Sequence, residues 1–138
     1  MWKYYAILSA VFAAFTAIFA KIGVKNIDSN LATAIRTVVI LFIVWGIVLF
    51  GKETAGIKDL TRTNWTFLIL SGIATGLSWL FYFKALQLGE ASKVAPVDKL
   101  SVVFTILLSF IILKEPFSWK TITGGLLIAA GSLVILTK

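Results

Sequence analysis

Apolar residues form five long stretches along the chain, separated by short polar segments. These stretches cover approximately residues 4–20, 31–50, 65–86, 92–113 and 119–136. A helix that crosses the hydrocarbon core of a bilayer needs about 20 predominantly apolar residues, and each stretch is close to that length. Backbone groups inside a bilayer must be paired within the protein, which favours helices over open strands. The pattern predicts an all-α integral membrane protein with five transmembrane helices in a single domain, residues 1–138.

Composition supports the same class and excludes most others. The 138 residues are 59% hydrophobic and 14% charged, which leaves too little polar surface to cover a water-soluble domain. His and Cys are absent from the sequence, so the usual transition-metal ligands and thiol nucleophiles are missing. We therefore expect no enzyme, no metal site and no cofactor. The net charge of +7 fits a protein of the prokaryotic cytoplasmic (inner) membrane and does not require a nucleic-acid partner.

The number of spans carries a topological consequence. Because five is odd, the two termini are predicted to face opposite sides of the membrane. Two copies inserted in opposite orientations would form an inverted repeat, which many transporters build within one chain. We therefore interpret the chain as half of a ten-helix inverted-repeat transporter fold. Two copies could also pack in parallel, in which case they would not form an inverted repeat.

The basic residues are divided almost equally between the two predicted faces. The face of the N-terminus has six: Lys3, Lys52, Lys58, Arg62, Lys114 and Lys120. The opposite face has seven: Lys21, Lys25, Arg36, Lys84, Lys93, Lys99 and Lys138. Because an excess of Lys and Arg in cytoplasmic loops normally sets orientation, this near tie predicts dual topology. If basic residues near span ends count less, the N-terminal face has a slight excess and a single orientation is expected instead.

Two segments resemble a known transporter family. Residues 82–86 (Tyr-Phe-Lys-Ala-Leu) and 91–96 (Ala-Ser-Lys-Val-Ala-Pro) resemble the junction of the third and fourth helices in EamA-type domains of the drug/metabolite transporter superfamily. Residues 114–116 (Lys-Glu-Pro), followed by Gly124 and Gly131, resemble the short acidic loop and glycine-bearing last helix of that family. The resemblance extends over essentially the whole chain, including the five spans.

The resemblance implies a function and a partner. Most members of this superfamily are similar to two such domains fused in tandem, which move metabolites across the membrane. This chain has one domain, so the resemblance implies an antiparallel homodimer or a heterodimer with a related half-transporter. It implies a small-molecule substrate but does not identify one.

Two spans carry polar residues at helical spacing. The fourth has Asp98, Ser101, Thr105 and Ser109, and the third has Ser71, Thr75, Ser78 and Tyr82. Steps of three and four place each set on one helix face. Such faces are expected to turn away from the acyl chains, toward the bundle interior or a water-filled pathway. Packing between helices through hydroxyl and small residues is the alternative.

Four charged residues are predicted at similar depth inside the spans. These are Arg36, Lys84, Asp98 and Lys99, near the face opposite the N-terminus. Because an isolated charge in a bilayer is costly, pairing around Asp98 is expected. Three cations against one carboxylate would leave a basic vestibule that attracts an anionic group of the substrate, with Asp98 orienting a lysine or carrying a coupling proton. The alternative is that the long basic side chains snorkel to the interface.

Two further residues are candidates for other roles: Pro96 for bending a helix and Glu115 for a local ion pair. Pro96 removes one backbone hydrogen bond inside a helix and is expected to kink the fourth span, unless that helix begins later. Glu115 is expected to pair locally with Lys114 or Lys120, and only the family resemblance gives it a functional role.

The preferred hypothesis is a small secondary transporter that moves an anionic or zwitterionic metabolite by alternating access. A non-transporting membrane subunit or scaffold, paired with another single-domain protein, is the alternative from a different class. A lipid-flipping or channel function is a third, minor hypothesis.

Overall fold

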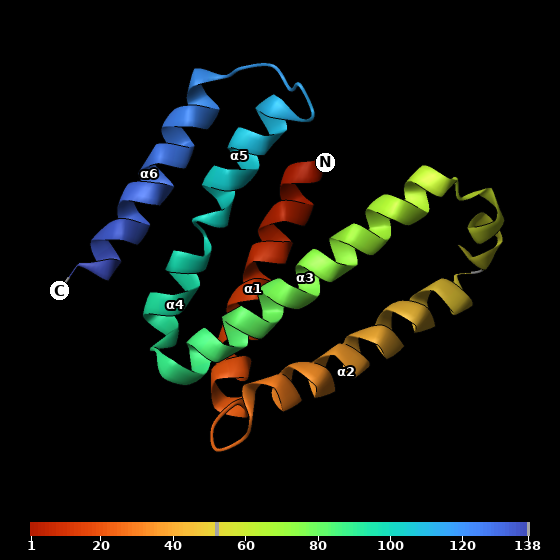
Figure 1. Cartoon of the computed structure of the whole chain (residues 1–138), viewed down its shortest axis with the longest axis horizontal. Coiled ribbons are helices and arrows are strands. Elements are labelled where there is room, and N and C mark those ends of the chain that lie inside the picture. Colours follow the sequence, from red (N-terminus) through yellow and green to blue (C-terminus); the bar gives the residue numbers. More distant parts are fainter. Residues whose placement is uncertain (52, 138) are drawn as a thin grey trace. The chain divides into compact units, whose positions relative to one another are not determined.

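The chain folds into helices joined by short turns, as a computed structural model shows (Figure 1). The structure describes residues 1–51 and 53–137. Lys52 and Lys138, two of the cations in the charge balance, lie outside the described residues. The helices are α1 (Trp2–Gly23), α2 (Ser29–Phe50), η1 (Glu53–Asp59), α3 (Arg62–Leu88), α4 (Ala91–Asp98), α5 (Ser101–Ile111) and α6 (Trp119–Leu136). No strand occurs in the described part of the chain, and the all-α prediction is confirmed.

Within the described residues, five helical segments are long and apolar enough to cross a membrane, as predicted. Four of them are the continuous helices α1, α2, α3 and α6, and the fourth span runs from Ala91 to Ile111 through α4 and α5. Their large apolar side chains point outward: Phe42 and Phe81 are 73% and 74% exposed. Such a surface is stable in contact with lipid and not in contact with water.

Local sequence explains where several helices begin and end. The Asp28 carboxylate accepts hydrogen bonds from the backbone N–H groups of Asn30 (2.8 Å) and Leu31 (3.2 Å) and so caps the start of α2. Asn26, with φ of 63°, makes the turn that precedes this cap. Lys114, with φ of 53°, turns the chain after α5, and the backbone N–H of Glu115 then bonds the Ser109 carbonyl.

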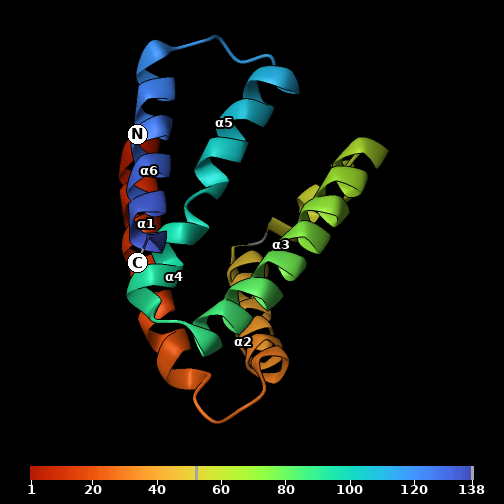
Figure 2. The ribbon, with the colours of Figure 1, turned by 60° about the vertical axis from the view of Figure 1, so that its left-hand side comes forward.

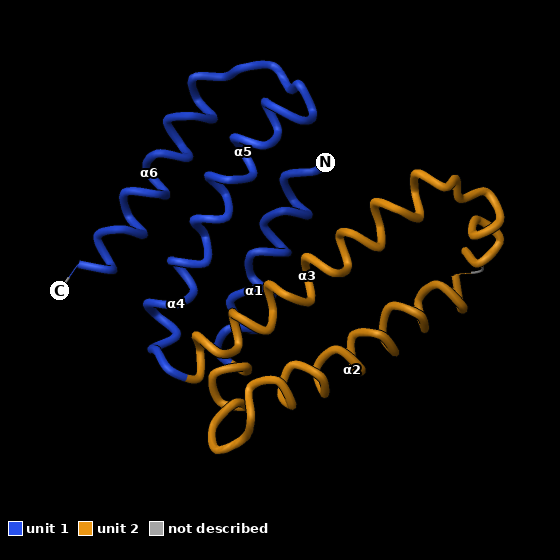
Figure 3. Tube along the Cα trace, viewed as in Figure 1, with its two compact units in different colours: residues 1–18, 88–138 blue, residues 19–87 orange. Residues whose placement is uncertain are grey.

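The chain divides into two compact units (Figure 3). Unit 1 comprises Met1–Ile18 and Leu88–Lys138, and unit 2 comprises Phe19–Gln87. In unit 1, α6 packs along both α4 and α5, which Figure 2 shows from a second direction. Unit 2 contains the end of α1, the unbroken helices α2 and α3, and η1.

Candidate functional site

The fourth span is interrupted in its first half, where unit 1 places Asp98 and Lys99. The backbone N–H of Lys99 bonds the Pro96 carbonyl, and that of Leu100 bonds the Val97 carbonyl, both at 3.0 Å. These are bonds to the third preceding residue, which replace the α-helical bonds to the fourth. The predicted kink at Pro96 is therefore a break between α4 and α5, two residues after the proline.

The break withdraws helical donors from two carbonyl groups. Pro96 has no N–H to offer the Ser92 carbonyl. The N–H of Lys99 bonds Pro96, so the Ala95 carbonyl also loses its helical donor. Carbonyl groups freed by an interrupted membrane helix are a recurring means of binding ions or substrates in transporters.

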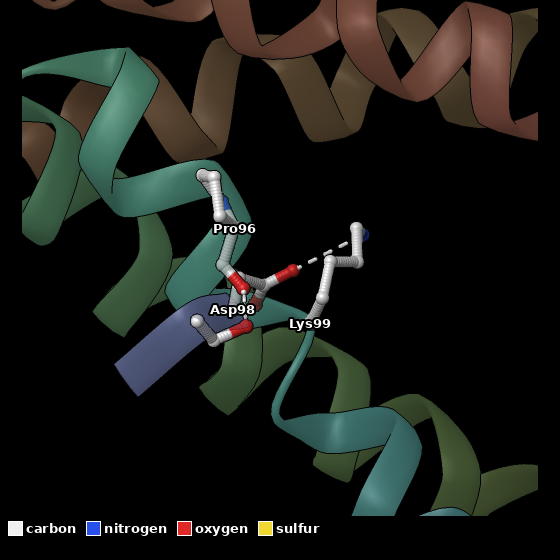
Figure 4. Close-up of polar contacts among 4 residues, drawn as sticks. Pro96, Asp98 and Lys99 are labelled. Carbon is white, nitrogen blue, oxygen red and sulfur yellow. Dashed lines mark hydrogen bonds and ion pairs between the residues drawn. The ribbon is translucent and has the colours of Figure 1, made fainter. Parts of the chain in front are cut away.

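Asp98 and Lys99 form an ion pair at this break (Figure 4). The Lys99 Nζ atom lies 3.4 Å from Asp98 Oδ2, and the side chains are 54% and 36% exposed, respectively. A second pair, between Lys93 of α4 and Glu90 at the N-cap position of that helix, is closer at 3.1 Å but more exposed, at 60% and 69%. Of the two carboxylates, Asp98 is therefore the less exposed.

Ser132 ties the break to the last helix, and sequence reasoning missed it. Its hydroxyl donates a 2.8 Å hydrogen bond to the Pro96 carbonyl, and the residue is only 4% exposed. Close packing of α6 supports this contact, because a Cβ atom on Gly125 would lie 2.7 Å from the Ile106 Cδ1 atom. The only sequence signal was a serine within the apolar last span.

The predicted polar stripe of the fourth span is divided by the break. Asp98 ends α4, whereas Ser101, Thr105 and Ser109 lie on α5, so the predicted stripe is shared between two helices. The Thr105 hydroxyl donates to the Ser101 carbonyl (2.9 Å), and the Ser109 hydroxyl donates to the Ile106 carbonyl (3.0 Å). Hydroxyls bonded to their own helix are already satisfied, so they do not require a polar environment.

The stripe of the third span lies on the continuous helix α3. Thr75 bonds the Ser71 carbonyl of its own helix at 2.8 Å, and Ser78 is exposed. Tyr82 is half-buried, and its ring makes an edge contact with Phe83 at a centroid distance of 6.4 Å. These residues occupy the face that their spacing indicates, but nothing in unit 2 assigns them a ligand.

Arg36 and Lys84 both lie in unit 2. The Arg36 guanidinium carbon lies 4.3 Å from the Trp79 ring centroid and 5.2 Å from that of Phe83. The Lys84 Nζ atom donates to Gln87 Oε1 at 3.1 Å. Because Asp98 and Lys99 belong to unit 1, a single vestibule formed by all four charges stays a prediction. Sequence reasoning missed the role of Trp79 and Phe83, although their spacing of four places them on one helix face.

Glu115 lies in the exposed loop between α5 and α6. Its expected ion pairs with Lys114 or Lys120 do not occur among the described residues. The residue instead takes part in the turn through its backbone, which bonds Ser109 at 3.2 Å. Its side chain has no contact that suggests a function.

Comparison with known proteins gives a consistent result. The model of the EamA-like transporter family matches residues 1–137. An uncharacterized transporter encoded in the cobO 3' region of a Sinorhizobium species is 47% identical over 97% of this chain and 95% of its own length. The human solute carrier family 35 member G1 is 29% identical over 93% of this chain, but over only 34% of its own length.

A third relative is matched over less of its length. The uncharacterized transporter YvbV of Bacillus subtilis is 37% identical over 51% of this chain and 23% of its own length. No solved structure matches the chain. The family match over nearly all residues, together with the five apolar spans, shows that this integral membrane protein belongs to the EamA-like transporter family.

Proposed function

We propose that the protein is a small secondary transporter that moves an anionic or zwitterionic metabolite across a prokaryotic cytoplasmic membrane by alternating access. Family membership supports transport and not enzyme activity. The observation that carries the proposal is the break in the fourth span, where an ion pair lies beside carbonyl groups without helical donors. A broken helix inside a membrane is tolerated where it faces protein or a water-filled cavity, and not where it faces lipid.

The Asp98–Lys99 pair is the proposed functional centre. Charged residues within membrane spans are expensive, and they commonly mark substrate pathways or proton relays. Asp98 either orients Lys99 toward the substrate or carries a coupling proton. The proposed pathway also includes Arg36, Lys84, Ser78, Tyr82, Ser101 and Thr105, with Pro96 setting the break.

We further propose that two copies assemble as an antiparallel homodimer. The nearly equal division of basic residues between the two faces supports insertion in both orientations. Two oppositely inserted copies of five spans would supply the ten helices of an inverted-repeat transporter. The Sinorhizobium relative, of which the match covers 95%, is of similar length.

Transport by the purified protein tests the proposal. The chain would be reconstituted into liposomes and offered a panel of labelled amino acids and small carboxylic acids, with and without an imposed pH gradient. We expect uptake of at least one compound above the level of empty liposomes. In Asp98→Asn, uptake should fall by about tenfold or more, equivalent to about 1.4 kcal/mol.

The matched control is the other ion pair of α4. Glu90→Gln also removes one carboxylate from a lysine pair on this helix, but at a more exposed position. It should leave uptake nearly unchanged, as should Lys58→Gln and Lys120→Gln, whereas Lys99→Gln should reduce it. Equal tolerance of all these substitutions would contradict the proposed role of the break.

The alternative is a non-transporting subunit that pairs with another related chain. Its basis is that this chain matches only 34% of the length of the human relative, so that a second chain could supply sequence that the longer protein contains. Purification from native membranes distinguishes the two. A distinct second chain in stoichiometric amount supports the alternative, whereas the chain alone, active in liposomes, supports the homodimer.

A further inference from the structure

Unit 2 holds one guanidinium group against two aromatic rings. Arg36 on α2 lies over the face of Trp79, with its guanidinium carbon 4.3 Å from the ring centroid, and lies 5.2 Å from the Phe83 centroid. Both rings belong to α3. Cation–π contacts at these distances stabilise the cation and fix the plane of the guanidinium. Phe83 is only 2% exposed, so one wall of this arrangement is anchored in the protein interior.

The position of the guanidinium argues against snorkelling. Two hydrogen bonds join the end of α3 to the preceding elements: Gln87 Nε2 donates to the Ile27 carbonyl (2.7 Å), and Lys21 Nζ donates to the Leu86 carbonyl (2.6 Å). From this end, Trp79 lies about 12 Å along α3 and Arg36 about 11 Å along α2, at 1.5 Å per residue. Phe83 lies about 6 Å along α3 from the same end, so the guanidinium is held between the levels of the two rings and not at the helix end. A snorkelling side chain would turn toward the helix end.

The charges at this end of unit 2 are unbalanced. Lys21, Lys25 and Lys84 are close in sequence to the helix ends that meet there, Arg36 lies two turns into α2, and Asp28 is the one carboxylate of unit 2 near these ends. Glu90, two residues beyond the end of α3, belongs to unit 1 and pairs with Lys93. Its Oδ1 atom already accepts two backbone N–H groups at the start of α2. The other acids of unit 2, Glu53 and Asp59, lie in η1, beyond the far end of α2. Among the described residues, no carboxylate pairs with Arg36.

A stacked guanidinium without a carboxylate partner has a specific binding capacity. Stacking uses the face of the group and leaves the N–H donors along its edge. Those donors match the two oxygens of a carboxylate in a bidentate, charge-assisted hydrogen bond. We propose that Arg36, held by Trp79 and Phe83, binds the carboxylate of the transported metabolite. This inference rests on the proposed function and adds the chemical group that is recognised and the residues that recognise it.

Trp79 supplies a reporter for this binding. The full chain would be placed in nanodiscs of phosphatidylcholine, and its tryptophan emission would be measured while acetate or L-glutamate is added at constant ionic strength. We expect a saturable change with both carboxylates and none with chloride. The change should disappear in Trp79→Phe. In Arg36→Leu, the half-saturating concentration should rise by about tenfold or more, as expected for loss of a hydrogen bond to a charged group.

Two variants separate recognition from general electrostatics and from misfolding. Arg36→Lys keeps the charge but lacks the planar fork, so we expect weaker binding in a protein that retains its helical circular dichroism. Lys25→Gln removes a cation from the same end of unit 2, outside the aromatic contact, and should leave the titration unchanged. Equal weakening by Lys25→Gln and Arg36→Lys would overturn the proposal, because it would indicate a diffuse positive field.

Other outcomes would also overturn it. These are an unchanged titration in Arg36→Leu, tighter binding of inorganic phosphate than of either carboxylate, or an emission change that anionic phosphatidylglycerol alone produces. Two results distinguish a failure of the carboxylate site from a failure of the proposed transport function. Uptake in liposomes with the same KM in Arg36→Leu would refute the carboxylate site and leave transport intact. Carboxylate binding through Arg36 without any uptake would refute transport and leave the site intact.

Discussion

Unit 1 holds its membrane-embedded charges at a broken helix, whereas unit 2 holds Arg36 on an unbroken one. At the break, Lys99 is paired with the adjacent carboxylate of Asp98, 3.4 Å away. In unit 2, the Arg36 guanidinium rests on the Trp79 and Phe83 rings. The first arrangement neutralises charge within the chain, and the second leaves hydrogen-bond donors for another molecule. Under the two proposals above, Arg36 in unit 2 recognises the substrate carboxylate, and Asp98 in unit 1 orients Lys99 toward the substrate or carries a coupling proton.

Among the substitutions that test this difference between the two units, one that restores the helix at the break in unit 1 should have the largest effect. Pro96→Ala adds an N–H four residues after Ser92, so its carbonyl can regain a helical partner. Because an interior proline costs a helix about 3 kcal/mol, the free energy of unfolding should rise by up to about that amount. Uptake should fall, because the continuous helix becomes more favourable than before relative to the interrupted helix on which transport is proposed to depend.

Thermal unfolding in detergent and uptake in liposomes would measure the two effects of Pro96→Ala. The chain contains one other proline, Pro116, which lies in the loop after α5. Pro116→Ala is therefore the control and should change neither quantity much. If Pro96→Ala changes neither the free energy of unfolding nor uptake, the break in unit 1 does not contribute to transport.

A smaller effect is expected from the contact between α5 and α6. A Cβ atom on Gly125 would lie 2.7 Å from Ile106 Cδ1, whereas no atom lies within 4 Å of the corresponding position at Gly124. Because the contacting atom is the terminal methyl group of Ile106, which can move aside, Gly125→Val should lower the free energy of unfolding by about 1–2 kcal/mol, the lower part of the usual cost of overpacking. Gly124→Val carries the same change in helix propensity without the clash. Similar unfolding midpoints for the two variants would show that α6 does not pack closely on α5.

The smallest effect is expected from substitutions at the starts of two helices, α2 in unit 2 and α4 in unit 1. Asp28 accepts two backbone N–H groups at the start of α2 in unit 2, whereas Glu90 occupies the equivalent position of α4 without a side-chain cap bond. Asp28→Ala should reduce the free energy of unfolding by about 1 kcal/mol, as expected for loss of an N-cap. Glu90→Ala removes an exposed ion pair and should cost less. Chemical unfolding in detergent would rank them, and the reverse order would contradict the capping assignment.

Much of the fold was readable from the sequence because lipid imposes simple requirements. Each span needs about 20 apolar residues and must pair its own backbone, so hydropathy alone located five helices. The ends were less certain because polar residues near the interface can continue a helix. The third span begins at Arg62 rather than near residue 65, for example. Pro96 predicted a kink, but not that Lys99 and Leu100 bond the third preceding residue or that Ser132 of α6 bonds the Pro96 carbonyl.

The candidate site was less predictable because its contacts join distant parts of the chain. The Ser132 hydroxyl reaches a carbonyl 36 residues away, and no local pattern indicates that pairing. Trp79 and Phe83 share a helix face by their spacing, yet their contact with Arg36 requires knowing how α2 and α3 approach each other. Hydroxyl spacing suggested a polar pathway, but the Thr75 and Thr105 hydroxyls bond their own helices. Local sequence cannot distinguish these two uses.

The orientation of the chain in the membrane tests the proposed antiparallel homodimer most directly. The sequence has no Cys, so single cysteines can be placed at Ile27 in the turn before α2 and, in a separate variant, at Ala55 in η1. Both substitutions preserve every charge, which matters because the basic residues are so evenly divided. Intact cells would be treated with a thiol reagent that cannot cross the membrane. We expect partial labelling of both positions. Labelling of one position alone would contradict the antiparallel homodimer and would show a single orientation.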